Sequence, residues 1–297
     1  MIVGASASQY VVQIVTGLGS AAVLFLISSG LTLTFGALRI VNFAHGSLYM
    51  LGAYLAVSLR EPIGFSNGTF WIVLILAGLG VALAGVVLEV FFFRPIYRRP
   101  LLTQLLVTFS FVLILAGIVR SIWGAEGEST SVPPFLGGGV KIAGGSIPTY
   151  QFFFMGLSVA VAVGLYLFLY RTGIGRMVRA AVSDPELLGL SGVNVRILFT
   201  GVFAVGAFLA GLAGAAVTMQ GLSGPDIAVR AVILAFVVIV IGGLGSLIGA
   251  FVASILVGLA QDLGIIWVPE ATLAIVFVVL VVVLAIRPQG LFGSRVA

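Results

Sequence analysis

One short stretch, NFAHGS at residues 42–47, contains several polar side chains next to long apolar runs. Its side chains are the best candidates for chemistry or for contact with a solute. His45 is the only histidine in the chain, and a histidine near a serine can act as a general base in a membrane enzyme. The stretch also suits contact with a zwitterionic solute, because a broken helix frees backbone groups that bind charged ends. Gly46 allows the tight turn that such a break needs. In a third interpretation, Asn42 and His45 merely cap helix ends.

A second glycine-rich stretch, GGLGS at residues 242–246, interrupts a long apolar run and is the counterpart of the first. Each stretch ends in G-S and is continued by leucine, and G-A with an aromatic residue follows at 52–54 and 249–251, which indicates a weak internal repeat. Gln104 and Thr108 share one helical face and either line a pathway or make packing hydrogen bonds. We predict that a substrate pathway is lined by Asn42, His45, Gly46, Ser47, Gln104, Thr108, Gly242, Gly243, Gly245 and Ser246.

Several kinds of chemistry are disfavoured by what the sequence lacks. There is no cysteine, which closes disulfide, iron–sulfur and thiolate-metal sites, and a single histidine argues against a histidine-built metal site. The chain contains no H-E-x-x-H, no G-x-S-x-G and no phosphate-binding G-x-x-x-x-G-K-[ST]. Almost no ionisable residue falls in the middle of an apolar run, which argues against coupling to protons or sodium. We expect no metal, no cofactor and no enzyme activity, with a membrane enzyme using His45 as the alternative.

The elements that position these residues must be membrane helices. The chain is 61% hydrophobic and 8% charged, whereas a soluble domain carries about 25% charged residues. Lipid offers no water to backbone groups, so spanning segments of this length must be helical. We predict an all-α, polytopic integral membrane bundle, a single domain over residues 1–297, with about eight or nine transmembrane segments, some short and broken. The expected spans are 9–35, 45–60, 69–93, 101–122, 150–170, 198–220, two short helices within 229–263, and 270–286.

The distribution of arginine predicts the orientation of these spans. The loops 36–44, 94–100 and 171–197 and the tail 287–297 hold ten of the fourteen basic residues, and loops with an excess of arginine face the cytoplasm. We therefore expect the N-terminus in the periplasm and the C-terminus in the cytoplasm of a bacterial inner membrane. The net charge of +5 is then explained by the basic residues of the cytoplasmic loops, and it does not indicate binding to nucleic acid.

The segment 171–197 is unusually polar for this chain. Asp184 can cap a short helix that begins at Pro185, and Glu186 then lies near the positive end of the helix dipole. Gly189 and Gly192 can close a turn. The segment is therefore expected to form one or two short helices outside the bilayer. They either lie on the membrane surface or enter a groove on another protein.

The stretch RAAVSDPELLGLSGVNV at residues 179–195 resembles the cytoplasmic coupling segment of ABC importer permeases, in particular branched-chain amino-acid permeases of the LivH/LivM type. Those read R-A-x-x-x-D-x-x-x-A-x-x-x-G-I-N-x, so Leu188 stands where the family usually has alanine. Residues 30–54, 240–251 and 287–293 are similar to three further blocks of the family, in the same order.

The resemblance implies a machine of several subunits. It implies that this permease pairs with a homologous permease, two ABC ATPase subunits and a periplasmic solute-binding protein, and moves amino acids across the bilayer by alternating access. ATP binding would close the ATPase dimer and pull on the segment 179–195. Arg176 and Arg179 would either pair with acidic residues of the ATPase or anchor the topology of the membrane spans. The residues that the resemblance assigns to ATPase coupling are Arg176, Arg179, Ala180, Ala181, Asp184, Glu186, Leu188, Gly189 and Gly192.

The substrate is less well defined than the family. Branched-chain amino acids are the first expectation, and urea, amides, aromatic acids or a sugar are alternatives with the same architecture. A membrane enzyme using His45 and a structural or assembly protein without a pathway are alternatives of other classes. The pore could be formed by two copies of this chain or by one copy with a relative.

Overall fold

The computed structural model describes residues 7–64, 66–221 and 224–293. Within these residues, nine helices have at least 15 residues each, and they match the expected spans one for one. The two helices expected within 229–263 are separate and are joined by a glycine-rich turn. The nine are α1 (Ala7–Leu38), α2 (His45–Ile63), α3 (Thr69–Leu88), α4 (Leu101–Trp123), α5 (Thr149–Arg171), α8 (Val195–Val217), α9 (Ile227–Gly242), α10 (Leu247–Trp267) and α11 (Thr272–Ile286).

Shorter elements join these helices. A five-residue π-helical turn, η1 (Glu89–Phe93), extends α3 and is followed by the 3-10 turn η2 (Arg94–Ile96). Two further short helices, α6 (Gly173–Ser183) and α7 (Pro185–Leu190), lie between α5 and α8. The remaining 3-10 turns are η3 (Pro134–Leu136), η4 (Thr218–Gln220) and η5 (Pro269–Ala271).

The expected loop at 123–149 contains the only departure from an all-α chain among the described residues. Strands β1 (Gly139–Ile142) and β2 (Gly145–Pro148) pair antiparallel, with Val140 opposite Ile147 and Lys141 opposite Ser146. Ala143 and Gly144, both with positive φ, form the two-residue turn that lets the strands pair. The hairpin packs on the start of α1, which explains why a short ribbon is ordered here.

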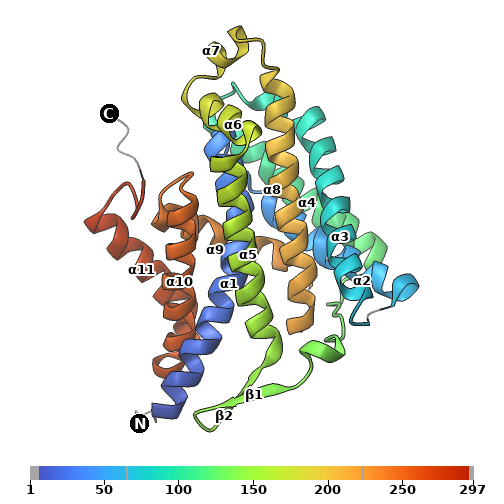
Figure 1. Cartoon of the computed structure of the whole chain (residues 1–297), viewed down its shortest axis with the longest axis vertical. Helices are drawn as coiled ribbons and strands as arrows, with labels where there is room; N and C mark the ends of the chain where they lie inside the picture. The colour runs from blue at the N-terminus through green and yellow to red at the C-terminus, as the bar shows by residue number, and fades with distance from the viewer. Residues whose placement is uncertain (1–6, 65, 222–223, 294–297) are drawn as a thin grey trace.

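The molecule has two distinct ends (Figure 1). The β1–β2 hairpin and the start of α1 lie at one, which we call the hairpin end, and α6 and α7 project from the other, the α6–α7 end. Among the described residues, seven helices are long and apolar enough to cross a membrane, and α9 is a shorter apolar helix. Helix α2 has a comparable length but more polar residues. The prediction of a polytopic helical membrane protein is confirmed.

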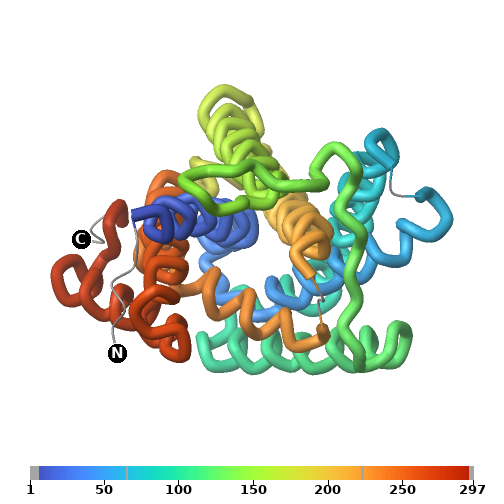
Figure 2. Tube along the Cα trace, turned by 90° about the horizontal axis from the view of Figure 1, so that it is seen from below, coloured from blue at the N-terminus to red at the C-terminus, as the bar shows by residue number. Residues whose placement is uncertain are grey.

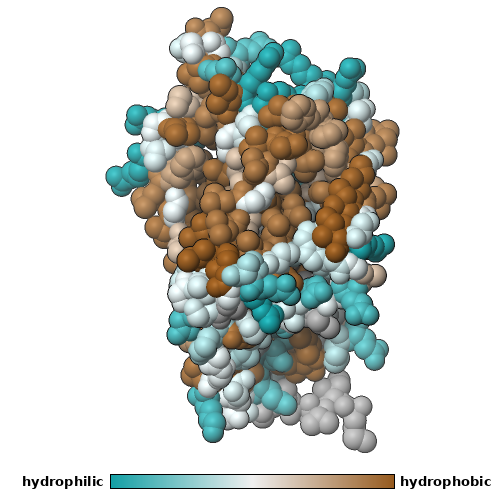
Figure 3. Space-filling model, turned by 90° about the vertical axis from the view of Figure 1, so that its right-hand side faces the viewer, coloured by the Kyte–Doolittle hydropathy of each residue, from teal (hydrophilic) through white to brown (hydrophobic). Residues whose placement is uncertain are grey.

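The centre of the bundle is made by α1, α2, α8 and α9, whereas α10 and α11 lie at one side and α3 at the other (Figure 2). Helix α11 buries only Val276. Large apolar side chains stay exposed along α3, α4, α5 and α11. On the face shown in Figure 3, hydrophobic residues cover the middle and hydrophilic residues gather toward the ends. Such a surface suits contact with lipid.

Candidate functional site

The segment 171–197, which we call the coupling segment, is shaped by three helix caps. The Thr172 side chain accepts a hydrogen bond from the Gly175 N–H at 3.0 Å and caps α6. The Asp184 carboxylate accepts bonds from the N–H groups of Glu186 and Leu187, at 3.0 and 2.9 Å, and caps α7 as the sequence predicts. Asn194 caps α8 by accepting from Ile197 at 3.2 Å. The segment therefore folds as two defined helices.

Helix α6 is held against the end of α5. Val178 and Ala181 are buried, as is Gly175, where a Cβ would collide with the carbonyl oxygens of Phe168 and Leu169. The guanidinium of Arg179 donates to the carbonyl of Leu169 and lies 4.9 Å from the centre of the Tyr170 ring. Arg179 thus has partners within its own chain, whereas Arg176 is exposed.

Helix α7 is the outermost part of the coupling segment and presents apolar side chains to the outside. Leu190 is 87% exposed and Leu187 is 61% exposed, although such leucines are usually covered. Glu186 is also exposed, 4.0 Å from Arg98, a distance that makes this surface pair weak. Gly192 has a φ of +84° and reverses the chain between α7 and α8. A short rigid helix with an apolar tip can insert into a groove of a partner.

A buried carboxylate supports the base of the coupling segment. Glu89, in η1, is fully buried and accepts hydrogen bonds from Arg94 at 2.9 and 3.2 Å, from the Tyr97 hydroxyl at 2.7 Å and from the Thr200 hydroxyl at 2.8 Å. Arg94 also donates to Thr200. Because Thr200 lies in the second turn of α8, this cluster ties the end of α3 to the helix that follows α7.

The NFAHGS stretch lies inside the bundle at the start of α2. Asn42, His45 and Ser47 are buried, and the Nε2 atom of His45 lies 3.0 Å from the carbonyl oxygen of Ile27 in α1. Helix α2 has no side-chain cap, so the interpretation of Asn42 and His45 as caps is wrong for this helix. The Ser47 hydroxyl and the Asn42 amide are buried without a hydrogen-bond partner among the described residues, so His45 forms no hydrogen-bonded pair with Ser47. At Gly46, a Cβ would collide with the Ala228 carbonyl of α9.

The GGLGS stretch forms the tight turn between α9 and α10. Ser246 caps α10 by accepting from the Gly249 N–H at 3.0 Å. Gly243 and Gly245 have φ values of +100° and +80°, which side chains rarely adopt. Gly245 packs on the backbone of Gly36 at the end of α1. The turn is therefore a packing element at the α6–α7 end.

Gln104 and Thr108 serve helix packing in this conformation. The Gln104 amide donates to the carbonyls of Tyr97 and Arg99, at 3.3 and 3.0 Å, and holds the loop before α4. The Thr108 hydroxyl lies 2.9 Å from the Gln104 carbonyl and 3.3 Å from the carbonyl of Val41. These contacts favour packing hydrogen bonds, and a pathway role for the two residues stays a prediction.

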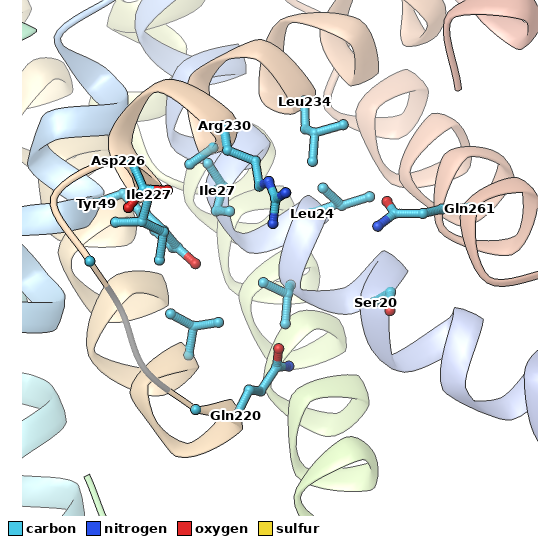
Figure 4. Close-up of a pocket in the computed structure, with 15 residues that line it drawn as sticks. Ser20, Leu24, Ile27, Tyr49, Gln220, Asp226, Ile227, Arg230, Leu234 and Gln261 are labelled. Atoms are coloured by element: carbon cyan, nitrogen blue, oxygen red, sulfur yellow. The ribbon is translucent and has the colours of Figure 1, made fainter. Parts of the chain in front are cut away.

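A cavity of about 330 Å³ opens between α1, α2, α9 and α10 beside the end of α8 (Figure 4). Its polar lining includes Ser20, Tyr49, Asp226, Arg230 and Gln261. The ten predicted pathway residues are absent from its described lining, although Ile27, which bonds His45, is part of it. A signal was present in the sequence, since Asp226 and Arg230 stand four residues apart at the start of a long apolar run.

The comparisons with known proteins decide the family. The family model described as "Branched-chain amino acid transport system / permease component" matches residues 13–284. The chain belongs to this permease family. The resemblance found in the sequence is thereby confirmed.

Curated relatives agree with this membership. The permease is 29% identical to the high-affinity branched-chain amino acid transport system permease protein BraD of Pseudomonas aeruginosa, over 96% of both chains. It is 28% identical to the permease protein LivH of Escherichia coli K12, over 90% of both chains. A more distant relative, the fructose import permease protein FrcC of Rhizobium meliloti, is 26% identical over 83% of this permease and 66% of FrcC. No solved structure shows a significant match.

Proposed function

We propose that this permease is the membrane-spanning subunit of an ABC importer and that it carries branched-chain amino acids inward by alternating access. Two ATPase subunits, a second permease and a periplasmic solute-binding protein complete the machine. The α6–α7 end faces the cytoplasm and the hairpin end faces the periplasm, because the arginine-rich loops lie at the α6–α7 end. The names of the amino-acid relatives support the substrate class.

One observation carries the assignment of ATPase coupling to this end. Leu190 is 87% exposed at the tip of a helix whose two ends are fixed by the Asp184 cap and the turn at Gly192. A capped helix loses little conformational entropy when it docks, and burying an apolar tip away from water lowers the free energy of the complex. The coupling segment is therefore organised in advance for a groove on an ATPase.

Replacing Leu190 by serine is expected to lower the retention of the ATPases on the purified permease at least tenfold, about 1.4 kcal/mol, because a buried apolar anchor at an interface contributes about 2 kcal/mol or more. The measurement is co-purification of the ATPases and second permease with a tagged chain, together with ATP-driven uptake of radiolabelled leucine. Leu102→Ser is the matched control, since Leu102 is also exposed but lies at the start of α4.

Equal retention of the ATPases by both variants would contradict the assignment of coupling to α7. A wild-type chain that purifies alone and still transports would contradict the importer as a whole and favour a different class. Urea, phenylalanine and fructose, tested beside leucine, decide among the substrate classes. The fructose relative makes the sugar comparison necessary.

A further inference from the structure

The cavity between α1, α2, α9 and α10 is lined by one basic and one acidic side chain. Arg230 and Asp226 line it from the start of α9, in a chain with few charged residues. Figure 4 shows the Arg230 guanidinium pointing into the cavity, with Gln261 on the far side; Asp226 is also part of the lining. A positive and a negative group therefore line the same open cavity.

The two charged side chains have no ion-pair partner in the part of the chain that the structure describes. Within the described ranges, the Arg230 guanidinium and the Asp226 carboxylate form no ion pair, with each other or with another residue, and no side-chain hydrogen bond. A guanidinium at the edge of a membrane bundle is usually paired or marks a functional site. The two groups remain available to a solute.

The remaining lining is aliphatic. Val23, Leu24 and Ile27 contribute from α1, and Ala231 and Leu234 contribute from α9. The volume of about 330 Å³ is at the lower end of the range for small-molecule sites. The space therefore suits a solute of amino-acid size and has an apolar wall for its side chain.

We propose that this cavity is a transit site for an aliphatic amino acid, in which Arg230 binds the carboxylate and Asp226 binds the ammonium group. Leu24, Ile27 and Leu234 contact the aliphatic side chain. Guanidinium binds carboxylate with two parallel hydrogen bonds, which gives both affinity and orientation. Gln261 and the hydroxyl of Tyr49 supply neutral hydrogen-bonding groups beside the charged ones.

The place of the cavity agrees with this role. It lies beside η4 and the start of α9, and Figure 1 shows α9 about midway between the two ends of the bundle, which a transported solute must cross. Asp226 and Arg230 are exposed to solvent, which limits the strength of each contact and lets a transported solute leave. The site rests on the proposed function and adds to it the groups that distinguish an amino acid from a sugar or urea.

The test compares leucine with an analogue that lacks the carboxylate. The complete transporter is purified with its ATPases, and equilibrium binding of radiolabelled leucine and of leucinamide is measured in detergent without the solute-binding protein. Arg230→Gln is expected to weaken leucine binding about tenfold or more, because a hydrogen bond to a charged group contributes about 1.5–3 kcal/mol. Leucinamide binding is expected to change little, so the preference for leucine over leucinamide is lost.

Asp226→Asn is the reciprocal variant, probed with 4-methylpentanoate, which lacks the ammonium group. It is expected to lose the preference for leucine over this acid. Lys141→Gln is the control, because Lys141 is a basic residue at the hairpin end that lies in β1, outside the cavity lining. Arg230→Lys keeps the charge and should retain part of the preference.

An unchanged preference for leucine over leucinamide in Arg230→Gln would overturn the proposal, and so would an equal loss of leucine binding in Lys141→Gln. Binding is measured without ATP-driven uptake, so it tests the site even if uptake fails. ATPase stimulation and leucine uptake by the wild-type complex are recorded in parallel. Their absence, with leucine binding retained, would contradict the importer rather than the site.

Discussion

Replacing Arg94 by methionine is expected to lower the free energy of unfolding of the permease by about 3 kcal/mol or more. The Glu89 carboxylate is fully buried, and the side chain of Arg94 is its only cationic partner among the described residues. Methionine fills a similar space but leaves this carboxylate with two hydroxyl donors, Tyr97 and Thr200. The buried carboxylate then has no cationic partner among the described residues, which costs free energy. Reversible unfolding in detergent, monitored by tryptophan fluorescence, measures the loss.

A second variant, changed at Glu89 as well, tests whether the loss of stability in Arg94→Met comes from the buried charge. The double variant Glu89→Gln/Arg94→Met removes both charges and is expected to recover most of the lost stability, because a neutral pair of similar volume is often tolerated. Arg98→Met is the control, since the Arg98 side chain is 93% exposed and its pairing with Glu186 is weak. If the double variant were no more stable than Arg94→Met, the buried carboxylate would not be the source of the effect.

The Glu89 cluster also explains why the coupling segment has a fixed base. Only residues 191–194 separate α7 from α8, and Thr200 bonds both Glu89 and Arg94. The π-helical turn at 89–93 brings the carboxylate to this position while Phe93 remains in the core. π-Turns inside membrane helices are often found at functional sites. If the proposed ATPases move α7, the force reaches α8 near Thr200, where hydrogen bonds connect α8 to the end of α3.

The helices of this fold were predictable from the sequence because the spans are long apolar runs separated by charged or glycine-rich loops. The expected span 101–122 is α4, which ends one residue later at Trp123, and the break at 242–246 is the turn before α10. The hairpin at 139–148 was missed, since two four-residue strands leave no pattern that stands out from a loop. Its pairing depends on contact with α1, which no local signal encodes.

The candidate site was predictable only in part, and for a physical reason. The Asp184 cap depends on a few neighbouring residues, so its sequence signal is local and was sufficient. The cavity depends on which side of each helix faces α1, α2, α9 and α10. Helices that are apolar all round carry no periodic signal for that choice. Asp226 and Arg230 are visible in the sequence as charges, but the sequence does not show that they face the same cavity as α1, α2 and α10.

Replacing Gly214 by alanine is expected to destabilise the permease by about 3 kcal/mol, the upper part of the usual range for overpacking. A Cβ at this position of α8 would collide with the carbonyl oxygen of Tyr49 and lie 3.0 Å from the Ala53 nitrogen, both in α2. Backbone atoms of a regular helix cannot rotate away as a side chain can. The two helices must therefore separate, which also disturbs the contact of Gly52 with Gly211. Thermal unfolding in detergent measures the expected loss.

Gly201→Ala supplies the matched control within the same helix. A Cβ there meets no described atom within 4 Å, and alanine favours a helix over glycine by about 1 kcal/mol, so this variant should be as stable as the wild type or more so. Because the two positions share the helix and the substitution, the difference between them isolates the close approach of α2 and α8. That approach places Tyr49 beside the cavity, so Gly214→Ala should also weaken leucine binding while Gly201→Ala leaves it unchanged. Equal stability of the two variants would mean that α2 and α8 do not pack this closely in the membrane.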